Sequence, residues 1–203
     1  MFGDQYYNGV IRKYVIAFGS LFNDIVIQRR NTAGQRIQSI QVPIAYGPKE
    51  KFLVRLRQDP NLSQQVALTL PRMGFEITAL TYNGARKLSS SLRNVAINSA
   101  DNNKVKSQYV PVPYDITFAL SIMCKNADDG AQILEQIVPY FRPEFTLNIR
   151  LIPELNIVVD TPVVLQDISI EDTYEGNFDE RRALVHTLNF SMKGYLYGPS
   201  SKT

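Results

Sequence analysis

Two stretches alternate so regularly between apolar and polar residues that they restrict the chain to a β-rich fold. The apolar face of the first, DITFALSIMC, consists of Ile116, Phe118, Leu120, Ile122 and Cys124. The corresponding face of the second, RALVHTLNFSMKGYLYG, consists of Leu184, His186, Leu188, Phe190 and Met192. Because strand side chains point alternately to opposite faces, each stretch predicts a strand with one buried face.

Three other segments have helical features. Residues 8–22 carry an apolar stripe, with Asn8 as the expected N-cap, and the stripe consists of Ile11, Tyr14, Val15, Phe18, Leu21 and Phe22. GPKEKFLVRLRQDP predicts a short helix. NADDGAQILEQIVPYF predicts a longer one that Asn126 caps and that two aspartates in the first turn favour through the helix dipole. Pro139 and Pro143 are expected to end that helix and turn the chain into a strand, FTLNIRLI.

The order of these patterns predicts an α+β fold with a central, mainly antiparallel β-sheet and two main α-helices packed on it. DIVIQRRNTAGQRIQSIQVPIAY adds two β-rich runs around a turn. Its tip is polar on both faces, so a β-hairpin is expected to project beyond the core. We expect a single domain over residues 1–203, with a flexible loop at about 84–107 and a short frayed tail at 199–203.

Charged and polar residues gather in three segments that are candidates for contacts with partners or subunits. The hairpin tip contributes Arg29, Arg30, Arg36 and Gln38. The predicted loop is basic, with Asp101 as its one acidic residue, and its basic residues are Arg86, Lys87, Arg93, Lys104 and Lys106. EDTYEGNFDE has no basic residue and carries Glu171, Asp172, Glu175, Asp179 and Glu180. The two oppositely charged loops are expected to meet across a subunit interface, where complementary charge sets register.

Sequence signatures of catalysis are missing. The chain has no dinucleotide or nucleotide phosphate-binding motif and no G-x-S-x-G elbow. With one histidine and one cysteine it lacks the ligands of a His/Cys zinc site and the means for an intrachain disulfide. His186 and Cys124 lie on apolar faces, so both are expected to be structural. We therefore expect a non-enzymatic protein without a metal or cofactor.

Other classes are also disfavoured. The net charge of +3 is small for a dedicated nucleic-acid-binding protein. The N-terminal MFGDQYYNG does not have the pattern of a signal peptide, and no apolar run is long enough for a membrane span. The protein is expected in the cytosol, or in an assembly that forms there.

Four segments, in this order and spacing, resemble the tail sheath stabilizer and completion proteins, or tail terminators, of large contractile-tailed bacteriophages. They are MFGDQYYNGVIRKYVIAFGSLFNDIVIQR, VPIAYGPKEKF, LPRMGFEITALTYN and SQYVPVPYDITFALSIMCKNADDGAQILEQIVPYFRPEF. The resemblance extends from Met1 to about Tyr197. Some members of that family carry a long polar C-terminal extension, whereas this sequence ends at Thr203, so no role of such an extension is carried over.

The resemblance implies a hexameric ring at the head-proximal end of a phage tail. Such a ring caps the tail tube and the contractile sheath, ends their polymerisation and gives the neck proteins a docking surface. DNA passes through its channel without sequence-specific binding, and the ring assembles in the host cytoplasm. Three alternatives remain: a neck or head–tail adaptor, a nucleic-acid-binding protein that uses the basic loop, and an enzyme with His186 as general base.

Overall fold

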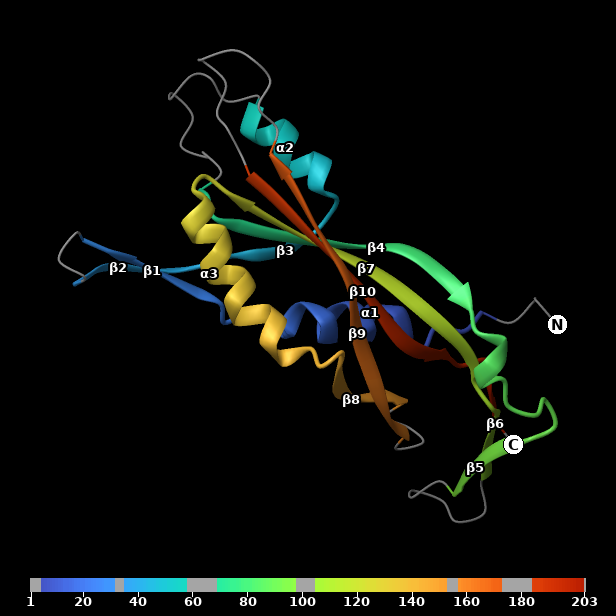
Figure 1. Ribbon diagram of the computed structural model, residues 1–203. Coiled ribbons are helices and arrows are strands. Elements are labelled where there is room, and N and C mark those ends of the chain that lie inside the picture. Colours follow the sequence, from blue (N-terminus) through green and yellow to red (C-terminus); the bar gives the residue numbers. More distant parts are fainter. Residues whose placement is uncertain are drawn as a thin grey trace.

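The computed structural model describes residues 5–31, 35–57, 69–97, 105–152, 157–172 and 184–202, and Figure 1 shows them around one long, twisted sheet. This six-stranded sheet has the strand order β3-β4-β7-β10-β9-β8. Its strands are β3 (Ile44–Tyr46), β4 (Arg72–Tyr82), β7 (Val112–Cys124), β8 (Glu144–Ile152), β9 (Ile157–Asp172) and β10 (Leu184–Leu196). Every neighbouring pair is antiparallel except β3 and β4, which are parallel. The expected mixture of helix and strand is confirmed, with strands dominating.

The two alternating stretches pair with each other at the centre of this sheet. β7 and β10 run antiparallel in continuous register, with Leu120 opposite Leu188 and Phe118 opposite Phe190. All four side chains are fully buried. The faces that the alternation predicted to be apolar therefore lie side by side, and together they form the sheet face that lines the core.

Two helices pack on that face of the sheet, α1 (Val10–Ser20) and α3 (Ala127–Ile137). Phe18 of α1 stacks on Phe118 with ring centroids 4.3 Å apart, and it also contacts the rings of Phe22, Phe75 and Phe190. The side chain of Ile133 from α3 joins the same core and is fully buried. Offset and edge-to-face aromatic contacts add to the free energy gained by burying these rings.

A third helix lies on the opposite face of the sheet. α2 (Lys49–Arg57) buries Phe52 in a small cluster with Met123 and Val185. These two residues alternate with Cys124 and Leu184, so they point away from the main core. The end of the sheet near α2 is thus covered on both faces.

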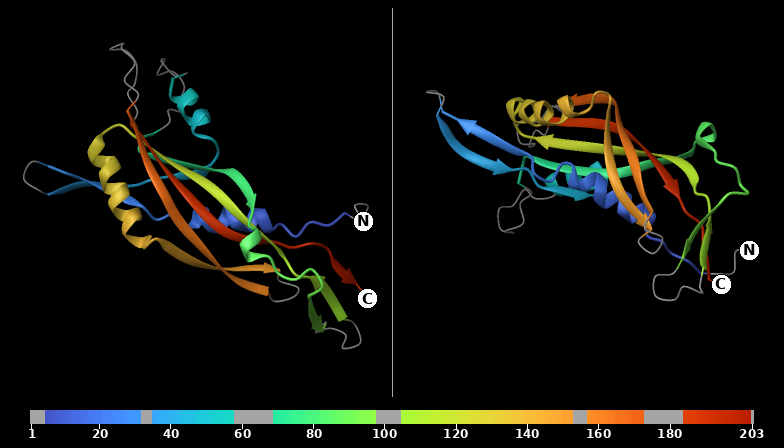
Figure 2. Two further views of the ribbon diagram at one scale, coloured as in Figure 1. Left: turned by 45° about the vertical axis from the view of Figure 1, so that its right-hand side comes forward. Right: turned by 90° about the horizontal axis from the view of Figure 1, so that it is seen from below.

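Smaller elements extend from the two ends of the molecule. The predicted hairpin is present as β1 (Val26–Arg30) and β2 (Arg36–Gln41), and it projects from the body at the left of Figure 1. A three-stranded sheet of β5 (Arg93–Ile97), β6 (Val105–Tyr109) and β11 (Ser200–Lys202) lies at the other end (Figure 2). Two short 3-10 helices, η1 (Gly84–Arg86) and η2 (Val138–Tyr140), complete the described elements.

The structure differs from the sequence-based expectation in two segments. The flexible loop predicted at about 84–107 contains η1, β5 and the first residues of β6, while residues 98–104 lie outside the described part of the chain. The predicted frayed tail at 199–203 includes β11, which pairs with β6. The polar composition of both segments hid short strands that pair only with each other.

The predicted helix caps are also changed in detail. At α1 the N-cap is Gly9, with φ of 62°, a left-handed conformation that glycine adopts without strain. The side chain of Asn8 instead donates to the backbone carbonyls of Tyr197 and Gly198. Asn126 is the N-cap of α3 as expected, but its side chain forms no capping hydrogen bond. α3 ends at Ile137, before the predicted Phe141, and η2 continues the chain to Tyr140.

Candidate interaction surfaces

The projecting hairpin is fixed to the body through α3. The side-chain carbonyl of Gln132 accepts a hydrogen bond from the backbone N–H of Gln28 (3.0 Å), and the Gln136 amide donates to the carbonyl of Val26 (2.9 Å). Arg29 forms an ion pair with Asp129 at 3.3 Å, and the Asp129 side chain is only 3% exposed. The outer edge of β1 is therefore occupied within the chain, and the guanidinium of Arg29 is partly engaged.

The second strand of the hairpin keeps its surface open. Arg36 and Gln38 are exposed on β2, and between them Ile37 is 67% exposed. The side chain of Arg30 is outside the described part of the structure, although its backbone pairs with Arg36. An anchored hairpin with an exposed edge suits binding by strand addition, so this segment remains a predicted interaction surface.

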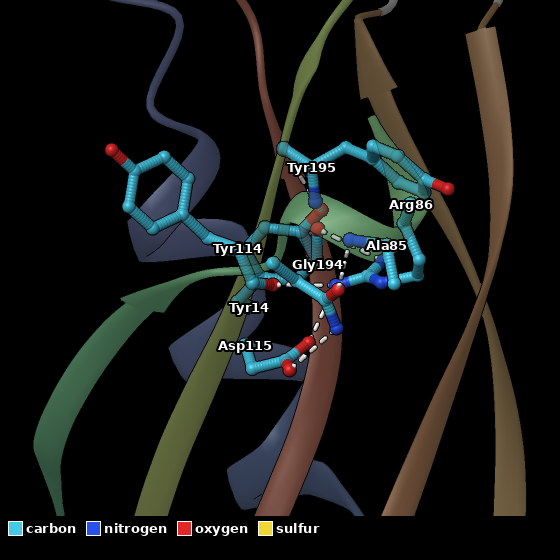
Figure 3. Close-up of polar contacts among 8 residues, drawn as sticks. Tyr14, Ala85, Arg86, Tyr114, Asp115, Gly194 and Tyr195 are labelled. Carbon is cyan, nitrogen blue, oxygen red and sulfur yellow. Dashed lines mark hydrogen bonds and ion pairs between the residues drawn. The ribbon is translucent and has the colours of Figure 1, made fainter. Parts of the chain in front are cut away.

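Arg86 lies inside a network of the chain's own groups, which Figure 3 shows. Its guanidinium pairs with Asp115 at 2.6 Å and donates to the carbonyls of Tyr114 (3.0 Å) and Gly194 (3.4 Å). It also lies over the ring of Tyr195, 5.1 Å from the centroid. This basic residue thus ties η1 to β7 and β10, and its charge is engaged within the protein.

A buried tyrosine extends the same network from the other side. The hydroxyl of Tyr14 donates to the carbonyl of Tyr195 (3.1 Å) and accepts from its N–H (2.8 Å). Burial raises the pKa of Tyr14 to about 12, even though its backbone hydrogen bond acts in the opposite direction. This link was not predictable from the sequence, because Tyr14 is simply one member of an apolar helical stripe.

The other basic residues of this segment differ in their exposure and in their partners. Lys87 is exposed. Arg93 donates to the hydroxyl of Tyr109 (2.7 Å) and lies 4.5 Å from its ring centroid. Lys104 lies outside the described residues, and so does the side chain of Lys106 in β6. The predicted basic surface is therefore described only at Lys87 and Arg93.

Most of the acidic segment is outside the described part of the structure. The residues concerned are Glu175, Asp179 and Glu180, together with the side chain of Asp172. Glu171 is exposed and pairs with Lys49 of α2 at 3.2 Å. An exposed pair of this kind contributes little stability. Residues 172 and 184, which border the segment, pair at the end of the sheet near α2, whereas β5 and β6 lie beyond the opposite end (Figure 1).

The lone histidine and the lone cysteine are both buried beneath α3. Burial, together with the charge of Asp129, raises the pKa of the Cys124 thiol to about 12, so the reactive thiolate is strongly disfavoured. His186 is 6% exposed, and neither ring nitrogen has a hydrogen-bond partner among the described residues. A Cβ at Gly130 would collide with its Nε2. This close packing against α3 fits the structural role expected for His186.

Burial lowers the pKa of His186 below its ordinary value, which makes the stability of the protein depend on pH. The unfolded side chain binds a proton near pH 6.5, whereas the folded one resists protonation, so stability is expected to fall as the pH drops below about 6.5. We expect His186→Asn to reduce this dependence. Urea unfolding between pH 5 and 8 measures it, and equal slopes in both proteins would contradict the assignment.

Two site classes find no support within the described residues. No group of three or more His, Cys, Asp or Glu side chains there could hold a metal ion. No helix of the described chain is long and apolar enough to cross a membrane.

Comparison with known proteins identifies the family. The family model of the T4-like virus Myoviridae tail sheath stabiliser matches residues 5–203. The chain is also 32% identical, over 98% of its length, to the tail completion protein gp15 of Enterobacteria phage T4, and the alignment covers 74% of that protein. The chain belongs to the tail sheath stabiliser family. The family resemblance drawn from the sequence is thereby confirmed, and the protein has a structural role in a phage tail.

Proposed function

We propose that the protein forms a hexameric ring that caps the head-proximal end of the tail tube and contractile sheath. The ring ends and stabilises the tail and provides the surface on which the neck docks. The match to the tail sheath stabiliser family over residues 5–203 carries this proposal. Its similarity to a protein named for tail completion supports the same place in the virion.

The distribution of charge fits a ring of repeated contacts. The acidic segment is attached near α2, and the exposed side chains of Lys87 and Arg93 lie toward the opposite end of the sheet. β7 has 13 residues, so these ends are separated by about 40 Å at ~3.3 Å per residue. The described parts of the two charged regions therefore lie too far apart to meet within one copy. A contact between copies that joins two different surfaces closes into a ring when its rotation allows.

Binding alone performs this function, without a chemical step. DNA passes through the ring without sequence-specific contacts. One of the basic residues that would otherwise serve nucleic-acid binding, Arg86, pairs with Asp115 of the same chain. This engagement lowers the positive charge available for phosphates.

The proposal is tested by incubating the purified protein with tails that lack it. We expect electron microscopy to show added density at the head-proximal end alone, and the mass of the bound material to correspond to six copies per tail. Protein that ignores tail ends but binds the portal side of heads would instead identify a neck adaptor. Binding to free DNA that weakens steeply with salt would favour the nucleic-acid alternative.

A further inference from the structure

At each edge of the central sheet, half of one strand has no neighbouring strand among the described residues, and we call such a segment an open half-strand. β3 pairs with Met73–Phe75 of β4, and no described strand pairs with the outer edge of residues 76–82 beyond it (Figure 1). On the other side, β8 pairs with β9 as far as Val164. The N–H of Leu165 still donates to the carbonyl of Pro143 (3.3 Å). From Asp167 to Asp172, β9 is bonded to β10 on one edge, and no described strand pairs with the other.

The directions of these two strands suit pairing between copies. β4, β7, β10 and β9 are neighbours in antiparallel pairs, so β4 and β9 run in opposite directions. A second copy placed beside the first in the same orientation therefore brings its β4 antiparallel to the first copy's β9. Such a contact joins two different edges, so it is heterologous and repeats from copy to copy.

The open half-strands carry exposed apolar side chains on the same face of the sheet. On β4 these are Leu80 (44% exposed) and Tyr82 (48%), and on β9 they are Ile168 (39%) and Ile170 (65%). Leu80 is opposite the buried Ile116 of β7, and Ile168 is opposite the buried Leu188 of β10. All four side chains thus continue the core face beyond the part that the helices cover.

We propose that neighbouring subunits of the ring join by extending this sheet, with residues 78–82 of β4 pairing antiparallel with residues 168–172 of β9 in the next copy. The inference rests on the proposed ring. Matching the faces places Leu80 opposite Ile170 and Tyr82 opposite Ile168. Aromatic and β-branched residues are favourable cross-strand partners, and Thr81 then lies opposite Ser169.

This register shifts each copy along the strand direction relative to the next. Leu80 lies at the level of Ile116 of β7, whereas Ile170 lies at the level of Ile122. The two levels are six residues apart along β7, roughly 20 Å at ~3.3 Å per residue. Repetition of the shift tilts the strands relative to the ring plane, as in closed barrels.

A second copy is favoured over another partner for two reasons. Both halves of the pairing are present on the same chain, with matched direction and matched apolar faces. The same register also places Asn83 opposite Asp167, so an amide lies beside a carboxylate next to the apolar pairs. Complementary polar groups of this kind help to fix register in an interface.

Disulfide cross-linking tests the pairing. A double variant, Thr81→Cys with Ser169→Cys, is bound to tails and oxidised. Within one copy the two positions lie on strands separated by β7 and β10, about 14 Å apart across the sheet, which is too far for a disulfide. We expect a ladder of covalent multimers up to the full ring on a non-reducing gel, whereas a mixture of the two single variants gives dimers only. The buried Cys124 is retained.

Two controls separate this inference from the proposed function. Val95→Cys, at an exposed position on β5, combined with Ser169→Cys is expected to give no ladder. Rings visible on tail ends without a ladder from the 81–169 pair, or from an 81–167 pair shifted by two residues, would overturn the sheet pairing and leave the ring intact. Absence of the rings themselves would overturn both.

Discussion

Replacing Phe18 with alanine is expected to lower the free energy of unfolding by about 3–5 kcal/mol. The ring is fully buried and contacts Phe22, Phe75, Phe118 and Phe190, so its removal leaves a cavity between α1 and the sheet. These partners come from separate elements and cannot all move in to fill the space. Urea denaturation followed by far-ultraviolet circular dichroism measures the loss.

The same helix supplies a matched control at Ile16, which is 60% exposed. Ile16→Ala also removes an apolar side chain from α1 and slightly favours the helix. We expect the unfolding free energy of this variant to stay within about 0.5 kcal/mol of the original. A similar loss from both variants would mean that helix formation, rather than the aromatic core, limits stability.

The second large effect is expected at Arg86. Arg86→Ala removes the ion pair with Asp115 and the bonds to two backbone carbonyls, and it leaves a carboxylate that is only 29% exposed without its main partner. Losing charged hydrogen bonds in a partly buried site is expected to cost about 2–3 kcal/mol. Asp115 keeps its bond from Asn83, which limits the loss.

Arg93→Ala is the control for Arg86, because it removes the same charge from the same basic segment. Arg93 is exposed and bonds only to the side chain of Tyr109 among the described residues, so the expected loss is about 0.5 kcal/mol. Thermal unfolding of both variants distinguishes the roles. If the two arginines proved equivalent, the network in Figure 3 would not be important for stability.

Elements whose hydrophobic period matches their buried face were predictable from the sequence. The alternation from Ile116 to Cys124 located β7, and its face is buried as predicted. The amphipathic segments located α1 and α3, and the turn between two β-rich runs located the hairpin. In each case a single repeating pattern decides both the local structure and the side that packs.

Features that depend on distant partners were not predictable. The ion pair between Arg29 and Asp129 links residues a hundred positions apart, and nothing local distinguishes Arg86 from the exposed Lys87. β5 and β11 are short and lie among polar residues, so they are recognisable as strands only once β6 lies between them. A charge pattern indicates where polar groups gather, whereas the fold decides which of these groups already have ion-pair or hydrogen-bond partners within the chain.

The pairing of β11 with β6 has a consequence for the order in which parts of the molecule fold. Ser200–Lys202 complete a sheet whose middle strand lies about a hundred residues earlier in the chain. The side chain of Asn8 depends in the same way on Tyr197, 189 positions away, for one of its hydrogen bonds. Contacts between such distant positions form slowly, because the entropy of closing a long loop is lost before the contacts stabilise the fold. We therefore expect this end of the molecule to become ordered later than the β7–β10 centre of the large sheet.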